Sequence, residues 1–309
     1  MKSLPQQPLS LIERACLIGH IIAMAFGLAG LLYVLPRPDL IASLPPIGIQ
    51  FFQWSMGQGG VGYIILGAAA VALYLARVLG WQRMLLFFLP SVGLSLGSEL
   101  LGTSTGFPFG HYHYLSGLGY KVAGLVPFTI PLSWFYMGAV CYLLVMVGLE
   151  RLNLPGLLRQ AGAVVGGAVL LMAWDLVLDP AMSQTSLPFW EFEEIGEFFG
   201  MPYRNLSGWV ATGMVFMSVA ALLWRGQRLN LTRSQLTVPV IVYLVNFAFG
   251  AVITVFSLDP GFLVPTMMSV AIGVLPAVLL WAIAPTEAPN AESAETAPLN
   301  APPLEVVAK

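Results

Sequence analysis

Three acidic residues that could do chemistry, Glu99, Asp175 and Asp179, stand at the ends of long apolar runs. Segments rich in aromatic residues lie nearby, at 106–114 and 189–194. A carboxyl group in apolar surroundings stays protonated, because burial disfavours its charged form. Such a group can protonate a trisubstituted double bond, and aromatic faces stabilise the resulting tertiary cation by about 0.5–2 kcal/mol each. These residue types therefore suggest acid-catalysed addition to an electron-rich alkene, in which water or an internal double bond captures the cation.

The candidate site residues fall into two groups. As catalytic residues we consider the acids and two histidines: Glu99, Asp175, Asp179, His111 and His113. As substrate-binding residues we consider the neighbouring aromatic and amide side chains: Tyr112, Tyr114, Trp134, Tyr136, Trp190 and Asn205. The alternative for any single acid is structural, since it could cap a helix end or pair with Lys121 or Arg204. Three acids and two histidines beneath aromatic loops together favour a functional site.

The composition excludes a soluble enzyme. The chain has 309 residues, of which 58% are hydrophobic and only 9% are charged, whereas a soluble domain has about a quarter charged residues. A net charge of −2 and the lack of a basic run argue against nucleic-acid binding. Cys16 and Cys141 lie in apolar runs and predict neither a disulfide framework nor a metal site. With three histidines the chain also lacks histidine-rich iron-binding boxes, so we expect no metal and no cofactor.

A membrane-spanning helix needs roughly 20 apolar residues, and the chain has eight segments of that kind. They lie at residues 15–35, 60–79, 84–101, 128–149, 161–178, 206–224, 238–258 and 262–283. The sequence therefore predicts an all-α, polytopic helical bundle that forms one integral membrane domain over residues 1–284. Residues 285–309 are rich in Pro, Ala and Glu, a composition that cannot bury a core and predicts a disordered tail.

The loop charges predict the orientation. With eight spans, ten basic residues fall on one side: Lys2, Arg14, Arg77, Arg83, Arg151, Arg159, Arg225, Arg228, Arg233 and Lys309. Three fall on the other: Arg37, Lys121 and Arg204. Because basic loops face the cytoplasm, both termini are predicted to be cytoplasmic. Three long loops, at 36–59, 102–127 and 179–205, then cap the non-cytoplasmic face, where the ends of the third, fourth and fifth spans bring the acids together.

Other features of the spans have structural interpretations. We expect His20 to be a packed helix residue and Asn246 to form an interhelical hydrogen bond. The glycine-rich run at 57–62 precedes a membrane helix instead of following a strand, so it indicates close helix packing and not dinucleotide binding. The same interpretation applies to two glycine pairs: Gly93 with Gly97, and Gly162 with Gly166.

Two further predictions concern the end of the fifth span and the loop after it. Asp179 precedes Pro180, and proline disfavours helical geometry in the residue before it, so we expect the helix to end there. Apolar residues recur at helical spacing through 188–200, with glutamates on the opposite face. This pattern predicts a short helix that lies in the membrane interface.

Two separated blocks of the chain carry a family resemblance. The first comprises Glu99, Gly102, Gly106-Phe-Pro-Phe-Gly110, Tyr112, Tyr114, Gly119, Val126-Pro127, Ile130-Pro131 and Trp134. The second comprises Trp174-Asp175, Asp179-Pro180, Trp190, Gly200-Met-Pro202, Asn205 and Gly208-Trp209. In order and spacing both blocks resemble the CruF-type carotenoid hydratases of bacteria and archaea, over most of the chain from the second span to the sixth.

The resemblance implies an enzyme without a cofactor that adds water across the terminal C1–C2 double bond of an acyclic (ψ) carotenoid end group. The substrate would resemble γ-carotene or lycopene, or in haloarchaea a longer carotenoid, and the product is a tertiary 1-hydroxy carotenoid. It also implies three kinds of partner: the lipid-soluble carotenoid, the lipid bilayer and other enzymes of carotenoid biosynthesis. The expected location is a bacterial inner membrane or a thylakoid membrane.

On this hypothesis Glu99 or Asp175 delivers the proton to C2 of the end group. Asp179, together with His111 or His113, orients and deprotonates the attacking water. The aromatic rings that face the cation are those of Tyr112, Tyr114, Trp134 and Trp190, and Asn205 holds the loop or the water. Two alternatives stay open: a lycopene cyclase, which shares the protonation step but must exclude water, and a membrane transporter or carotenoid-binding protein, which needs no catalyst.

Overall fold

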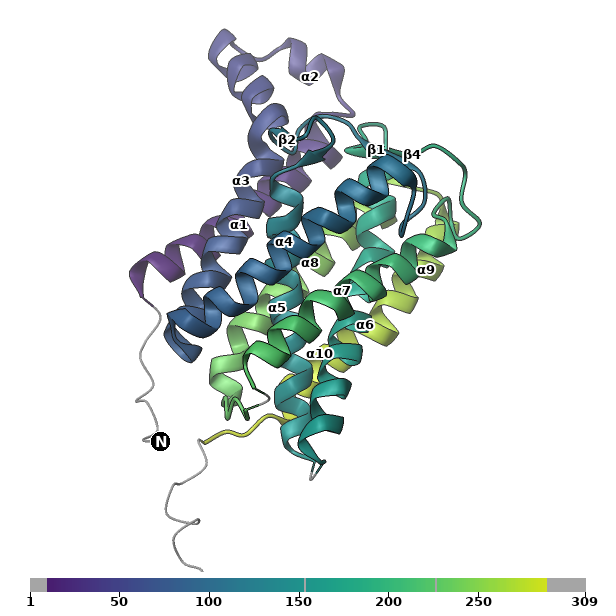
Figure 1. Cartoon of the computed structure of the whole chain (residues 1–309). Coiled ribbons are helices and arrows are strands. Elements are labelled where there is room, and N and C mark those ends of the chain that lie inside the picture. Colours follow the sequence, from purple (N-terminus) through teal and green to yellow (C-terminus); the bar gives the residue numbers. More distant parts are fainter. Residues whose placement is uncertain (1–9, 153, 226, 288–309) are drawn as a thin grey trace, which may run out of the picture.

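The computed structural model describes residues 10–152, 154–225 and 227–287; the part of the expected tail at 288–309 lies outside the described residues. Within the described ranges, eight helical segments are long and apolar enough to cross a membrane. They are Leu11–Val34, Pro46–Leu79, Trp81–Thr105, Thr129–Glu150, Gly156–Ser183, Tyr203–Leu223, Arg233–Ser257 and Pro260–Ile283. The predicted all-α bundle of eight spans is confirmed (Figure 1).

The elements follow one another in chain order. The first half contains α1 (Leu11–Ala29), the π-helical turn η1 (Gly30–Val34), α2 (Pro38–Ala42), α3 (Pro46–Leu79), α4 (Trp81–Thr105), β1 (Tyr112–Tyr114), β2 (Lys121–Val122), β3 (Val126–Pro127) and α5 (Thr129–Glu150). The second half contains α6 (Gly156–Ser183), β4 (Trp190–Phe192), α7 (Tyr203–Leu223) and α8 (Arg233–Ser257). The last span is built from η2 (Pro260–Phe262), α9 (Leu263–Ser269), the π-helical turn η3 (Val270–Val274) and α10 (Leu275–Ile283).

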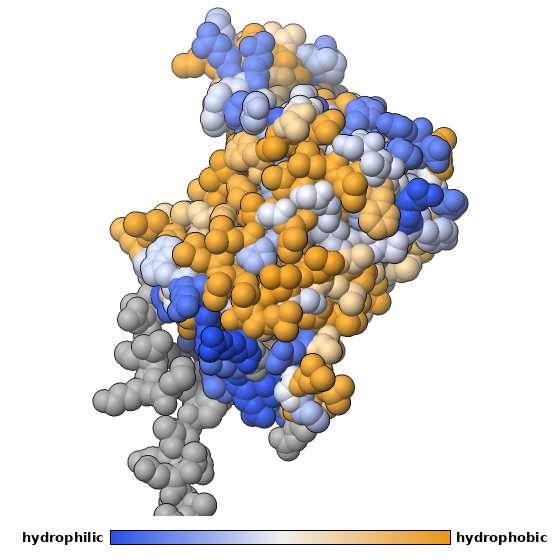
Figure 2. All heavy atoms as spheres, in the orientation of Figure 1, coloured by the Kyte–Doolittle hydropathy of each residue, from blue (hydrophilic) through white to orange (hydrophobic). Residues whose placement is uncertain are grey.

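Helix α5 is the centre of the bundle. It is buried along nearly its whole length, as expected for a helix that is apolar on every side. Helices α3, α4, α6, α8 and α10 all pack against it. Around this centre many large apolar side chains of the helices are exposed, and on the face that Figure 2 shows they form a broad hydrophobic band with polar residues above and below it. This distribution is the one expected of helices whose outer faces lie against lipid.

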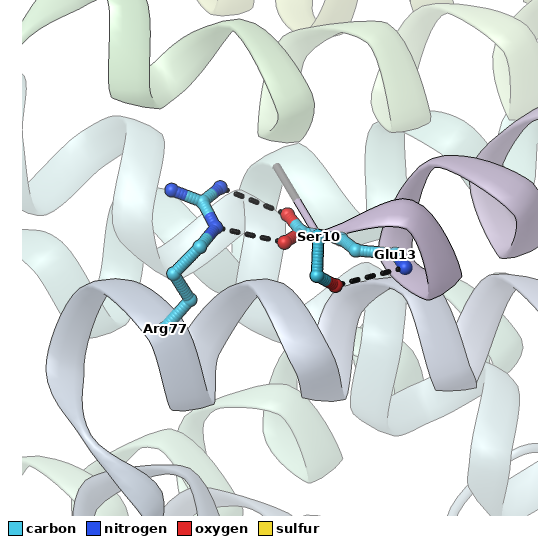
Figure 3. Close-up of polar contacts among 3 residues, drawn as sticks. All are labelled: Ser10, Glu13 and Arg77. Carbon is cyan, nitrogen blue, oxygen red and sulfur yellow. Dashed lines mark hydrogen bonds and ion pairs between the residues drawn. The ribbon is translucent and has the colours of Figure 1, made fainter. Parts of the chain in front are cut away.

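An ion pair attaches the start of α1 to the end of α3. The carboxylate of Glu13 accepts two hydrogen bonds from Arg77, at 2.7 Å from Nε and 2.8 Å from Nη2 (Figure 3). Ser10 caps α1, since its hydroxyl oxygen accepts from the backbone N–H of Glu13. The Glu13 side chain is only 1% exposed, so the pair holds the two helices together away from water.

A second set of polar contacts between helices, halfway along α1, confirms two predictions. His20 is fully buried, and its Nδ1 lies 2.8 Å from the carbonyl oxygen of Tyr63. Asn246 of α8 donates from Nδ2 to His20 Nε2 at 3.1 Å and accepts from the Tyr136 hydroxyl at 2.8 Å. Because Nε2 accepts, Nδ1 carries the proton of a neutral imidazole. His20 is therefore a packed helix residue, and Asn246 makes the expected interhelical hydrogen bond.

Helices α3 and α6 include residues at which the sequence predicted a loop or a helix end. The segment 36–59 is not a long loop, because it contains α2 and the first part of α3, which begins at Pro46. The predicted helix end at Asp179 is also wrong, because α6 continues to Ser183 with Pro180 inside it. Backbone groups that water does not reach need partners within the helix, and this requirement outweighs the local effect of glycine and proline. Asp175 and Asp179 consequently lie one turn apart on the same face of α6.

The prediction of close packing at glycines holds for one pair only. An added Cβ at Gly162 or Gly166 would lie 2.9 Å or 2.8 Å from side chains of α5, which confirms the close approach. At Gly93 and Gly97 of α4, nothing in the described part of the chain lies within 4 Å of an added Cβ. The prediction is wrong for that pair, which faces outward from the bundle.

A small antiparallel sheet caps one end of the bundle (Figure 1). Strand β1 pairs with β4 in the register Tyr112 with Phe192, His113 with Glu191 and Tyr114 with Trp190, so the predicted loops 102–127 and 179–205 join each other. The interfacial helix predicted over 188–200 is wrong, because this segment contains β4 and isolated β-bridges. Backbone pairing with a strand about 80 residues earlier outweighs the helical spacing of its apolar residues.

Candidate functional site

A cavity of about 40 Å³ lies between the cap and the adjoining ends of α4, α5, α6 and α7, which is room for a few water molecules. Its lining residues come from all four helices and from both strands of the cap. They are Glu99, Phe109, Tyr112, Tyr114, Ile130, Ser133, Trp134, Asp175, Leu178, Asp179, Trp190, Phe192, Asn205 and Trp209. The three acids predicted to converge therefore do so, together with five of the other predicted residues.

Glu99 of α4 is held by three hydrogen-bond donors. Trp134 of α5 donates from Nε1 to Oε1 at 2.8 Å, and the hydroxyls of Tyr112 and Tyr114 both donate to Oε2, the second at 2.8 Å. Burial and the nearby Glu99 raise the pKa of both tyrosine hydroxyls well above their usual range, so both keep their protons. Both oxygens of Glu99 are therefore engaged as acceptors, an arrangement suited to a negative charge.

Asp175 and Asp179 share one amide group. Asn205 of α7 donates from Nδ2 to Oδ2 of Asp175 at 3.0 Å and to Oδ2 of Asp179 at 2.6 Å. Trp190 of β4 donates from Nε1 to Oδ1 of Asp179 at 2.7 Å. Oδ1 of Asp175 is buried and finds no hydrogen-bond partner among the described residues. It is the only side-chain oxygen of the three acids that has no hydrogen-bond partner among the described residues. Buried polar atoms without partners are rare enough to need an explanation.

Tryptophan and phenylalanine rings form the walls of the cavity. Trp134 and Trp209 stack with ring centroids 4.2 Å apart, and Trp174 packs edge-on against Trp209 at 5.9 Å. The ring of Phe109 fits between α4 and α7 because both helices have a glycine there. An added Cβ at Gly102 or Gly208 would lie 2.8 Å or 2.6 Å from this ring.

The structure does not bring three of the predicted residues to the cavity. His111 and His113 are exposed on the outer side of the cap, and His113 lies 3.8 Å from Glu191 at the surface. Side chains alternate between the two faces of a strand, so the inward direction of Tyr112 and Tyr114 sends His113 outward. Tyr136 points to Asn246 and His20 instead, because it follows Trp134 by two positions, about 200° around α5.

Six lining residues were not among the predicted site residues: Phe109, Ile130, Ser133, Leu178, Phe192 and Trp209. Phe109 and Trp209 belong to the motifs that resemble the hydratases, so their signal was present in the sequence. Phe192 follows from the register of β4, where every second residue faces inward. Ser133 precedes Trp134 on α5, and nothing in its sequence context sets it apart from other serines in helices.

Among the residues that the structure describes, no lysine, arginine or histidine lines the cavity. Lys121 donates from Nζ to the carbonyl oxygen of Tyr114 at 2.5 Å, and neither Lys121 nor Arg204 forms an ion pair with an acid in the described part of the chain. Three carboxyl groups around one small cavity cannot all be charged without opposite charges. Within the described ranges, no group of three or more His, Cys, Asp or Glu side chains is arranged to hold a metal ion.

The three acids differ in how many of their carboxyl oxygens accept hydrogen bonds. The carboxylates of Glu99 and Asp179 have donors on both oxygens, whereas Asp175 keeps one oxygen without a partner. Asp175 lines a cavity rich in aromatic side chains, and a proton on that oxygen would have no acceptor among the described residues. The site is therefore suited to protonate an apolar guest and to stabilise a cation formed there.

Comparison with known proteins gives two matches. The model of a family described as "Carotenoid biosynthesis protein" matches residues 59–276, a range that contains every lining residue of the cavity. Bisanhydrobacterioruberin hydratase of Haloarcula japonica is 35% identical over 130 residues, which are 42% of this chain and 41% of that protein. The alignment thus spans less than half the length of this curated relative. No solved structure matches the chain.

Proposed function

Because the chain belongs to the carotenoid biosynthesis protein family, we propose that it is a carotenoid hydratase. It adds water across the C1–C2 double bond of an acyclic end group, such as that of lycopene or γ-carotene, and forms a tertiary 1-hydroxy carotenoid. The name of the haloarchaeal relative supports hydration as the reaction. Eight apolar helices support a substrate that is taken from the lipid phase.

The observation that carries the proposal is that Asp175 lines a cavity rich in aromatic side chains and has one buried oxygen without a hydrogen-bond partner among the described residues. In the first step the proton leaves Oδ1 of Asp175 and bonds to C2 of the end group, using the π electrons of the double bond. C1 becomes a tertiary cation. General acid catalysis of this kind contributes about 10²–10⁴-fold to a rate.

The cation is stabilised by the ring faces and by a nearby negative charge. Trp134 and Trp209 present ring surface to the cavity, and each suitably placed ring contributes about 0.5–2 kcal/mol. Glu99 supplies the charge, because its three donors hold it as an acceptor on both oxygens. Glu99 thus acts as a counter-ion and Asp175 as the acid.

Water completes the reaction at C1. Its oxygen bonds to C1, and its proton passes to the carboxylate of Asp179, which Asn205 and Trp190 hold in place. The proton then returns to Asp175, either directly or through water, so that the enzyme is unchanged and one water has been added. Asn205 aligns the two aspartates, since one amide nitrogen bonds to both.

Expression in a host that accumulates lycopene or γ-carotene tests the function directly. A gain of about 18 mass units in the pigment supports hydration, whereas a gain of about 16 indicates an oxygenase. An isomer of unchanged mass indicates a cyclase, and unchanged pigment indicates transport or binding. Any of these three results would overturn the proposal.

The assignment of Glu99 is tested with Glu99→Gln. This change keeps the size of the side chain but removes the charge beside the cation, so turnover should fall about 10²–10³-fold, as for loss of one electrostatic group in a site of this kind. The matched control is Glu150→Gln at the far end of α5, where the carboxylate accepts from backbone N–H groups. The control should retain its turnover.

A further inference from the structure

Hydrogen-bond direction is unusually uniform around the cavity. Six lining side chains have N–H or O–H donors that are committed to acceptors in the protein: Tyr112, Tyr114, Ser133, Trp134, Trp190 and Asn205. Apart from the proton that we propose on Asp175, the indole N–H of Trp209 is the one side-chain donor among the lining residues that meets no acceptor in the described part of the chain. The polar atoms left for a guest are therefore mostly acceptors.

Ser133 differs from the other five in where its donor goes. Its hydroxyl donates to the carbonyl oxygen of Ile130 in its own helix, at 2.7 Å, whereas the other five donate to the acids. Ser133 lines the cavity, and its hydroxyl is not used to hold a carboxyl group. Ser133 thus offers lone pairs to a guest on α5, the helix that also carries Trp134.

A water molecule among acceptors binds through its hydrogens, and a lone pair of its oxygen then remains free. This is the orientation that a nucleophilic water needs, because the lone pair must point to C1. We propose that Ser133 positions the attacking water by accepting one of its hydrogens, while the carboxylate of Asp179 accepts the other. This inference rests on the proposed hydration and names the group that directs the cation to water.

The cation has two fates, and Ser133 affects only one of them. In capture, the C1–O bond forms and the proton of the water goes to Asp179. In the second fate, which we call return, the cation loses a proton from C2 or from a methyl group to a carboxylate, and no water is added. Removal of the Ser133 hydroxyl should slow capture but leave the delivery of the proton by Asp175 intact.

Ser133→Ala is therefore assayed in membranes that contain the carotenoid and are suspended in heavy water. Each protonation introduces one deuterium, so deuterium in unhydrated pigment reports return and the hydrated pigment reports capture. The ratio of return to capture should rise about tenfold, as expected for the loss of one hydrogen bond in the capture step. This ratio does not depend on the amount of enzyme that folds.

Two variants separate the hydroxyl from packing. Ser133→Thr keeps a hydroxyl and should keep the ratio near that of the natural protein. Ser207→Ala is the matched control: Ser207 is likewise the fifth residue of its helix and bonds a carbonyl three residues earlier, but it is exposed. Its ratio should not change.

The inference is overturned if Ser133→Ala leaves the ratio within about twofold, or if Ser133→Thr raises it as much as alanine does. Failure of the hydration itself is seen separately. In that case the natural protein yields no hydrated pigment in the same membranes, whatever residue stands at position 133.

Discussion

The variant Asp175→Asn changes one oxygen at the cavity into an NH2 group and keeps the size and shape of the side chain. In the natural protein Nδ2 of Asn205 lies 3.0 Å from Oδ2 of Asp175. The oxygen that remains in the variant can accept this hydrogen bond. The NH2 group takes the place of Oδ1, which has no partner among the described residues, so no existing bond is lost. An amide cannot deliver the proton.

These contacts set the expected magnitudes. Loss of a general acid lowers turnover about 10²–10⁴-fold, which is about 2.7–5.4 kcal/mol in the activation free energy at 1.36 kcal/mol per factor of ten. The free energy of unfolding should change by less than about 1 kcal/mol, because the single hydrogen bond is kept.

Asp179→Asn is the informative comparison. Both oxygens of Asp179 accept from N–H groups, of Trp190 at 2.7 Å and of Asn205 at 2.6 Å. An asparagine would turn its NH2 group toward one of these donors, which should lower the free energy of unfolding by about 1–3 kcal/mol. Asp179→Asn should therefore reduce both stability and turnover, whereas Asp175→Asn reduces turnover alone.

The assay measures hydrated pigment per amount of membrane-inserted protein and, in detergent, the thermal unfolding midpoint of each variant. Asp259→Asn, at an exposed position before η2, serves as the control for the substitution itself. Near-normal turnover of Asp175→Asn would refute the role of this residue as the acid. Equal loss of stability in both aspartate variants would refute the distinction drawn from their hydrogen bonds.

Three further results are expected. His111→Ala combined with His113→Ala should keep turnover within about twofold, since both side chains are exposed; a loss above about tenfold in the pigment assay would contradict this. Glu13→Gln should lower the free energy of unfolding by about 1–3 kcal/mol through loss of the charged contact with Arg77, seen as a lower unfolding midpoint with unchanged turnover of the folded protein. The raised pKa of Tyr112 means that the folded state keeps a proton that the unfolded chain releases above about pH 10; stability should fall as pH rises beyond that value, and Tyr112→Phe should reduce the fall.

The number of spans and the convergence of the acids followed from local composition. Hydropathy sums over about 20 neighbouring residues, so it identifies helices without knowledge of their partners. Once eight spans are counted, the third and fifth spans run in the same direction. Their C-terminal ends therefore lie on the same side of the membrane, which places Glu99, Asp175 and Asp179 at one depth. Periodicity could also have separated Trp134 from Tyr136, since positions two apart lie on opposite sides of a helix.

Helix ends and cap structure depended on contacts that are distant in the sequence. Pro180 and the glycines at 57–62 are local signals for a break, yet the helices continue because a break would leave backbone groups without partners in a membrane. The segment 188–200 has helical spacing, yet β4 forms because β1 offers a strand to pair with. That pairing also decides that the tyrosines of β1 face the cavity and His113 does not.

The sequence by itself determined that three acids and several aromatic rings gather at one end of the bundle, but it also placed His111 and His113 among them. Only the tertiary structure decided how these groups differ from one another. Asn205, Trp190 and the two tyrosines approach the acids from other helices and strands, and each uses its hydrogens on particular oxygens. Hydropathy and spacing contain no information on such directions, because a hydrogen bond depends on the position of two atoms that the chain brings together only when it folds.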